Sequence, residues 1–206
     1  MVVWSLVIAI VSLLVSSVAL FFSRFRPFAP KIFNDQVAFG NVYLKTQKGN
    51  QRFIAVIMPC EIHNLGAHPG IIKDITFSLS SEQLGGEIHF FPLQFIEPNY
   101  VDKNGIRIVI DRPWDFITVP PHNFIRQTIF LVNDHPSPGQ PTKLTKGQHK
   151  YSIKYRKSGD KKWKTACEGQ VTLDEISLQQ LETVGNFHQP DMGTTELRNK
   201  LVNPAN

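Results

Sequence analysis

Residues 148–156, QHKYSIKYR, alternate between two kinds of side chain. Tyr151, Ile153 and Tyr155 fall on one side of an extended chain, and a lysine, serine or arginine falls on the other side at each even position from 150 to 156. Successive side chains of a strand lie on opposite faces of its sheet, so this alternation is typical of a strand with one buried face. The stretch therefore predicts a half-buried antiparallel strand.

Similar runs continue on both sides of this stretch. Within 52–62 every even position from Ile54 to Ile62 is apolar. Further β-rich runs, separated by turn residues such as glycine, proline and asparagine, span 37–46, 71–80, 86–96, 105–111, 124–132 and 162–173. A single short helix is expected over 174–183, opened by Asp174 and closed by Gly185. Short strands with such turns between them are typical of a sandwich or barrel.

The sequence thus predicts an all-β domain over residues 31–185. Its outline resembles the immunoglobulin and fibronectin type III domains, which implies an antiparallel β-sandwich of about 7–8 strands. The chain lacks the cysteine–tryptophan–cysteine spacing of true immunoglobulin domains, so the resemblance is one of fold. Residues 186–206 are polar and without strong pattern, and a flexible C-terminal tail is expected there.

The first 23 residues carry no charged side chain, and Val2–Phe22 is an apolar run interrupted only by serines. At about 1.5 Å per residue the run reaches about 32 Å, enough to cross a hydrocarbon core of about 30 Å. A cleaved signal peptide is the alternative, but it has a basic segment before an apolar run of only about 7–15 residues. The sequence therefore predicts one retained transmembrane helix over 1–23.

The flanks of this helix indicate its orientation. Arg24 and Arg26 lie in a proline-containing linker over 24–30, Lys31 follows, and no lysine or arginine precedes the helix. Positive residues collect on the cytoplasmic side of a membrane helix. We therefore expect a single-pass protein of the cell (inner) membrane with its C-terminal domain in the cytoplasm.

Small residues recur along one face of the predicted helix. They lie at spacings of four and three residues: Ser5, Ala9, Ser12, Ser16, Ala19 and Ser23. In lipid, small residues let helices approach closely, and serine hydroxyls can hydrogen-bond across the contact. This small-residue seam predicts self-association of the helix into a homo-oligomer; the alternative is a plain helix whose serines bond back to their own backbone.

Basic residues concentrate between positions 143 and 164. This segment holds nine lysines and arginines against one acid, Asp160, whereas the whole chain has a net charge of +5. The residues expected to bind an anionic ligand or lipid are Lys150, Lys154, Arg156, Lys162 and Lys164. Such a basic patch attracts anionic lipid, a nucleotide or nucleic acid. The alternative is that lysines only protect a sheet edge from pairing.

No motif of a catalytic, metal or cofactor site is present. The chain lacks a nucleophile elbow, a phosphate-binding loop and a dinucleotide fingerprint. Cys60-x-x-His63 with His68 nearby lacks a second ligand pair for zinc. Cys60 and Cys167 are expected to be buried thiols. The histidines are expected to lie at the surface or in turns. Glu61 beside His63 is either a general acid–base pair or, as we favour, a pair of ordinary surface residues. We expect a protein that is not an enzyme, with no catalytic residue, cofactor or metal.

These features favour a single-pass, membrane-anchored β-sandwich protein that binds an anionic ligand or a protein partner at the cytoplasmic face and self-associates through its helix. The organisation also resembles small single-pass proteins of bacterial antiviral systems. That resemblance implies a first alternative, an effector in which ligand binding drives the helices together and disrupts the bilayer. A second alternative, an exported surface domain, requires the opposite orientation.

Overall fold

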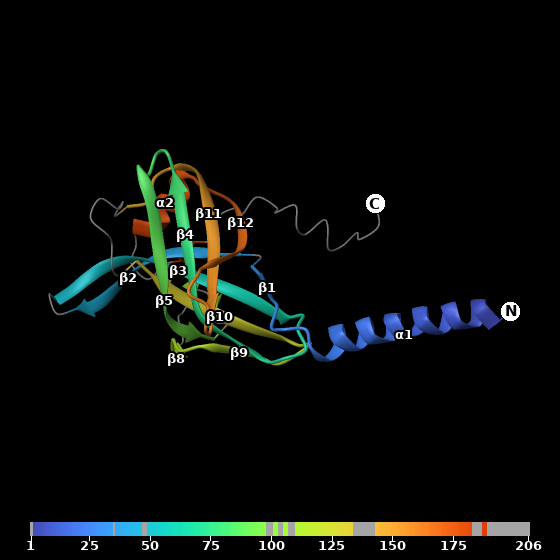
Figure 1. The fold of residues 1–206 in the computed structure, drawn as a ribbon. Helices are drawn as coiled ribbons and strands as arrows, with labels where there is room; N and C mark the ends of the chain where they lie inside the picture. Colours follow the sequence, from blue (N-terminus) through green and yellow to red (C-terminus); the bar gives the residue numbers. More distant parts are fainter. Residues whose placement is uncertain are drawn as a thin grey trace.

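The computed structural model describes residues 2–34, 36–46, 49–97, 101–102, 105–106, 110–133, 143–182 and 187–188. It contains an N-terminal helix, α1 (Val2–Arg24), followed by a domain built mostly of β-strands. Figure 1 shows α1 projecting from one end of this domain, with the short helix α2 (Glu175–Glu182) at the other end. The predicted combination of an apolar N-terminal helix and a β-rich domain is confirmed.

All of the strand pairs among the described residues are antiparallel. The order through the main sheet is β12 (Lys164–Leu173), β11 (Gly147–Lys157), β4 (Gly70–Ser81), β5 (Gly86–Ile96), β10 (Phe124–Val132), β3 (Gly49–Asn64), β2 (Ala38–Thr46) and β13 (Phe187–His188). Three short strands join this path: β1 (Pro30–Phe33) pairs β3, β8 (Ile110–Pro113) pairs β5, and β9 (Ile117–Val119) pairs β4. A separate two-stranded ribbon contains β6 (Val101–Asp102) and β7 (Gly105–Ile106).

Strand β5 turns the corner between the two halves of the sheet. Its first half, to Phe90, pairs with β4, and its second half, from Phe91, pairs with β10. The register with β10 shifts where Leu131 meets Pro92, and proline lacks the N–H that a regular ladder needs. Because of this bend, β1 on one side of the sheet contacts β12 at its far end. The main sheet is a near-closed barrel, so the predicted immunoglobulin-like sandwich is not confirmed.

The core fills the space inside the curled sheet. The even positions of β3 from Ile54 to Ile62 are buried, as the alternation predicts. Phe77 of β4 lies at the centre, in edge contact with Phe39 and Phe90 and stacked on Tyr151 of β11. A second, smaller apolar cluster includes Ala55, Phe130 and other residues on the opposite parity of β3 and β10.

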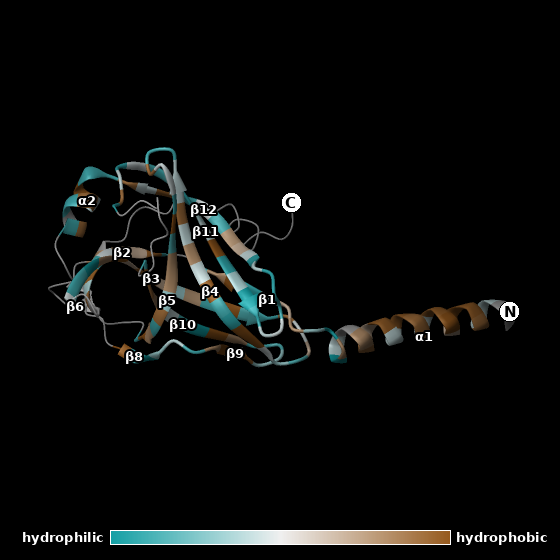
Figure 2. Ribbon diagram, turned by 60° about the vertical axis from the view of Figure 1, so that its left-hand side comes forward, coloured by the Kyte–Doolittle hydropathy of each residue, from teal (hydrophilic) through white to brown (hydrophobic). Residues whose placement is uncertain are grey.

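The helix α1 makes a long apolar rod, brown along most of its length in Figure 2. Its segment Trp4–Phe21 has a mean hydropathy of 2.4 and is not buried against the domain. By length and composition it is able to cross a membrane, but a signal sequence near an N-terminus has the same properties.

The C-terminal part of the domain begins as the sequence predicts. Asp174 caps α2, its Oδ1 accepting a hydrogen bond of 2.7 Å from the Ser177 N–H. Within the predicted tail, Phe187 and His188 form β13, which pairs with Gly40 and Phe39 of β2. The rest of the predicted tail lies outside the described residues.

Candidate functional site

The outer face of β11 presents the basic residues that the alternation predicts. Lys150 is exposed and lies opposite Gln170 of β12 and Ser80 of β4. Lys154 is half-buried between Thr165 and Thr76 on the same two strands. Among the residues that the structure describes, neither lysine has an acid within ion-pair distance. These two charges are therefore available to an outside anion.

Arg156 lies on the same face but is already engaged. Its Nη2 and Nε atoms donate to Oδ2 of Asp74 at 2.5 and 2.9 Å. Its guanidinium also lies over the ring of Trp163, 5.2 Å from the centroid. Arg156 thus holds Trp163 in place, while its charge is partly offset by Asp74.

The turn that joins β11 to β12 separates Lys162 from Lys164. Lys162 is exposed in the turn. Lys164 pairs across the strands with Tyr155, whose side chain points inward. Lys164 therefore does not share the face of Lys154, contrary to the prediction from strand alternation. The reason is a register shift between Ile153 and Lys154, which changes the parity of β12 relative to β11.

Lys164 forms an ion pair with Asp160 at 2.9 Å. This contact raises the pKa of Lys164 and lowers that of Asp160. A second ion pair joins Lys146 to Glu175 at 3.3 Å. Within the basic segment, the residues paired with acids of the domain are therefore Lys146, Arg156 and Lys164. Six lysines form no ion pair among the described residues: Lys143, Lys150, Lys154, Lys157, Lys161 and Lys162.

The predicted linker packs against the domain. The Ala67 N–H donates to the Arg26 carbonyl (2.9 Å), and the Leu65 N–H donates to the Ala29 carbonyl (3.1 Å). A side chain at Gly66 would overlap the carbonyl of Pro27, and one at Gly70 would overlap the ring of Phe28. We call Arg26–Ala29 the strap; its seat is formed by Gly66 of the β3–β4 loop and Gly70 at the start of β4, whose missing side chains make room for it.

Lys157, at the end of β11, fastens the strap from the other side. Its Nζ atom donates to the Phe28 carbonyl oxygen at 3.2 Å and lies 5.8 Å from the centre of the Phe28 ring. Burial, and then the nearby charge of Lys164, lower the pKa of Lys157. The end of β11 is therefore in direct contact with the segment that follows α1.

Asn64 braces the loops around the strap. It is buried, its side-chain nitrogen donates to the carbonyls of His68 (2.7 Å) and Pro120 (3.1 Å), and its oxygen accepts from the Gly66 N–H (2.8 Å). The His122 N–H also donates to the Gly66 carbonyl (3.2 Å). The loops at the α1 end thus form one connected unit. The sequence indicates only a tight loop at Asn64-Leu65-Gly66 and carries no signal for its longer-range contacts.

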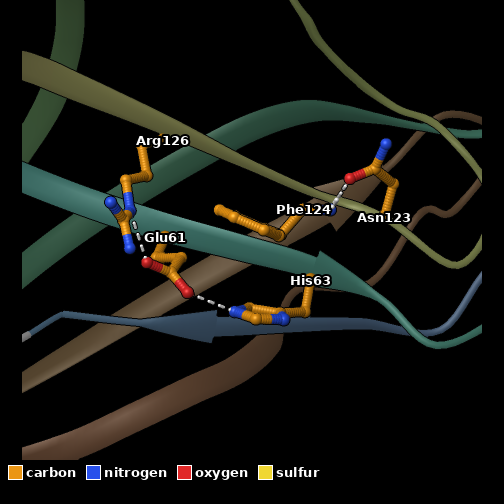
Figure 3. Close-up of polar contacts among 5 residues, drawn as sticks. All are labelled: Glu61, His63, Asn123, Phe124 and Arg126. Carbon is orange, nitrogen blue, oxygen red and sulfur yellow. Dashed lines mark hydrogen bonds and ion pairs between the residues drawn. The ribbon is translucent and has the colours of Figure 1, made fainter.

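A polar cluster covers the outer face of β3 and β10 at the same end (Figure 3). Glu61 accepts from Arg126 Nε at 2.6 Å and lies 2.5 Å from His63 Nε2. His63 stacks on Phe124, with 5.2 Å between ring centres. Arg126 and then His63 lower the pKa of Glu61.

This shift argues against the acid–base alternative for Glu61. A general acid or base works best with a pKa near the operating pH, and Glu61 moves away from neutrality. Because its pKa is lowered, its contribution to stability is present above its ordinary pKa of 4.5 and is lost as the pH falls through the lowered value. The geometry fits a cross-strand ion-pair network on an exposed surface.

The two cysteines are free thiols, Cys60 buried and Cys167 partly exposed. Burial raises the pKa of both, that of Cys167 to about 11. His149, in contrast, is fully buried on β11, with Nε2 2.8 Å from the Thr145 carbonyl, so the prediction that the histidines lie at the surface or in turns is wrong for this residue. No group of three His, Cys, Asp or Glu residues able to hold a metal is found in the described part of the chain.

The residues of the small-residue seam all lie exposed along α1. Ser17, which is outside the seam, donates from its hydroxyl to the Leu13 carbonyl at 2.8 Å within the helix. A single chain therefore leaves the seam open to another helix.

Comparison with known proteins finds no relative: no protein-family model matches the chain, and neither does any curated protein or solved structure.

Proposed function

We propose that this chain is a single-pass, membrane-anchored β-domain protein that binds an anionic ligand or partner at the cytoplasmic face and is not an enzyme. The observation that carries the proposal is the outer face of β11, where Lys150 and Lys154 are free of acids among the described residues. The aromatic residues of this strand, Tyr151 and Tyr155, are buried on the other parity. The face therefore supports charge recognition more than base stacking.

Anchorage and orientation are supported by the apolar length of α1 and by its flanks. Arg24 ends the helix and Arg26 follows it, while no basic side chain precedes it. The proposal places the β-domain in the cytoplasm, where free thiols such as Cys60 and Cys167 are the usual state.

The test uses the full chain in nanodiscs of neutral phosphatidylcholine, with a fluorescent oligonucleotide as a polyanion probe. Wild type should bind at low salt, and binding should weaken as salt rises. Lys150→Glu with Lys154→Glu should abolish binding without unfolding, since both side chains lie on the outer face. The matched control, Arg112→Glu with Lys143→Glu, carries the same change in net charge at exposed positions outside β11. Absence of binding by wild type at low salt would leave the face a solubilising surface only.

The small-residue seam favours a second candidate, the membrane-disrupting effector of an antiviral system. Its six residues are exposed on a single chain, so helices are able to meet along it. In this candidate, occupation of the β-domain drives α1 helices together. Toxicity on overexpression that disappears when α1 is deleted favours the effector; growth unaffected by overexpression favours the simple anchored binder. The exported alternative predicts instead that the β-domain lies on the non-cytoplasmic side of the membrane.

A further inference from the structure

The α1 end of the domain gathers positive charge from segments far apart in the sequence. The strap region 24–31 and the turn region 157–164 together hold seven lysines and arginines against one acid, Asp160. The loops beside them, 65–70 and 120–123, contain no acid. Hydrogen bonds from Ala67 to Arg26 and from Lys157 to Phe28 bring these segments together.

The opposite end does not share this excess of positive charge, because its basic residues are accompanied by several acids: Lys146 pairs with Glu175, and Arg52 donates to the carbonyls of Leu181 and Glu182. Asp174, Glu175 and Glu182 lie at the boundaries of α2 and on it, and Glu82 lies in the β4–β5 turn. Figures 1 and 2 both place α2 at the end of the domain away from α1. The excess of positive charge therefore lies at the end from which α1 leaves the domain.

The turn of the basic end also exposes an aromatic ring. Trp163 is 40 % exposed, and Arg156, held by Asp74, lies against its ring. Lys161 and Lys162 precede it and are exposed. Tryptophan beside lysine suits the headgroup level of a membrane, where an indole ring and a cation are both stabilised.

A flexible linker would let the domain rotate freely over the membrane, but the strap does not have that freedom. Two backbone hydrogen bonds, the seat at Gly66 and Gly70, and the contact with Lys157 hold it to the domain. The last residues of α1 and the first loops of the domain thus move together.

We propose that the strap holds the basic end of the domain on the anionic headgroups of the leaflet from which α1 emerges, with Lys161, Lys162 and Trp163 as contacts. The inference rests on the proposed function, because it needs α1 to stay in the membrane. The partner of the basic end is a lipid surface, because the strap joins this end to the membrane span and its positive charge is complementary to anionic headgroups. Lys150 lies seven residues from Lys157, which is up to about 23 Å along the strand. It is therefore available to bind a soluble anion.

The experiment compares two labelled positions on the full chain in nanodiscs. A fluorophore is attached to Ser158→Cys, in the β11–β12 turn, or to Gln83→Cys, in the β4–β5 turn at the end away from α1. Lipids with a headgroup nitroxide quench the label according to its proximity to the surface. In discs containing phosphatidylglycerol, the label at 158 should be quenched strongly and the label at 83 weakly.

Three sets of variants test the cause of this difference. Lys161→Glu with Lys162→Glu should reduce quenching at 158 in anionic discs, whereas Lys150→Glu with Lys154→Glu should leave it unchanged. Gly70→Ala should displace Phe28 and bring the two positions closer to equal quenching. Phe28→Ala should do the same without adding an atom to the domain, which keeps the test valid if Gly70→Ala fails to fold.

Three outcomes would overturn the docking, the contact residues or the proposed function. A chain that is retained in the disc but shows equal quenching at 158 and 83 overturns the docking while the anchorage stands. Equal sensitivity to the 161/162 and 150/154 reversals overturns the assignment of the contact residues. Failure of the chain to remain in the membrane overturns the proposed function and this inference with it.

Discussion

At the scale of single residues, one aromatic side chain connects the two halves of the sheet. Phe77 of β4 is fully buried and contacts rings from β2, β5 and β11. Phe77→Ala should lower the free energy of unfolding by about 3–5 kcal/mol, because it removes these contacts and leaves a cavity. The measurement is chemical denaturation of the chain in detergent, followed by tryptophan fluorescence. Phe91→Ala, on a ring that is 41 % exposed, is the control and should cost less than about 1 kcal/mol.

The two thiols give a second prediction at this scale. Burial raises the pKa of Cys167 to about 11, so at pH 8 only about one molecule in a thousand carries the reactive thiolate. Labelling of the folded chain with a maleimide should therefore be about a hundredfold slower than after denaturation. The rate should rise with pH up to the raised pKa, as measured by mass spectrometry. Rapid labelling of Cys60 at neutral pH would contradict the buried placement.

At the scale of elements, the small-residue seam of α1 makes a prediction about assembly. Ser12→Leu with Ser16→Leu should still insert, since leucine favours the membrane, but bulky side chains should keep two helices apart. Ser17→Leu is the control, because Ser17 lies off the seam and its hydroxyl bonds to its own helix. Crosslinking in native bilayers measures the association. Equal crosslinking of wild type and the double variant would mean that the spacing has no role in assembly.

The alternation of side chains was sufficient to predict most long strands, as with β11 and the even positions of β3. It missed β1 and β9, because PKIF and ITV are too short to show a period and lie beside prolines. The closure of the sheet into a near-closed barrel could not be predicted from the sequence either. It depends on the bend of β5 at Pro92 and on the register shift beside Lys154, and neither leaves a periodic signal in the sequence.

The docking of the linker between α1 and the β-domain could not be predicted from the sequence either. Pro27 and the residues after it are typical of a stiff linker, and nothing in 24–30 alone indicates where that linker docks. Its seat is formed by Gly66 and Gly70, about forty residues away, where the missing side chains admit Pro27 and Phe28. A contact of this kind becomes visible only when the loop and the linker are in one structure.

At the scale of the whole molecule, the proposed orientation follows from charge on one side of α1. Arg24, Arg26 and Lys31 all follow the helix, and charges within about 15–20 residues of a span decide its topology. A reporter fused after Asn206 should therefore be active as a cytoplasmic reporter. Replacing Arg24, Arg26 and Lys31 by glutamate and adding lysines after Met1 should move the reporter to the other side. Lys161→Glu with Lys162→Glu is the control, since these charges lie too far along the chain to affect insertion. Activity of the wild-type fusion on the non-cytoplasmic side would reject the orientation and favour the exported alternative.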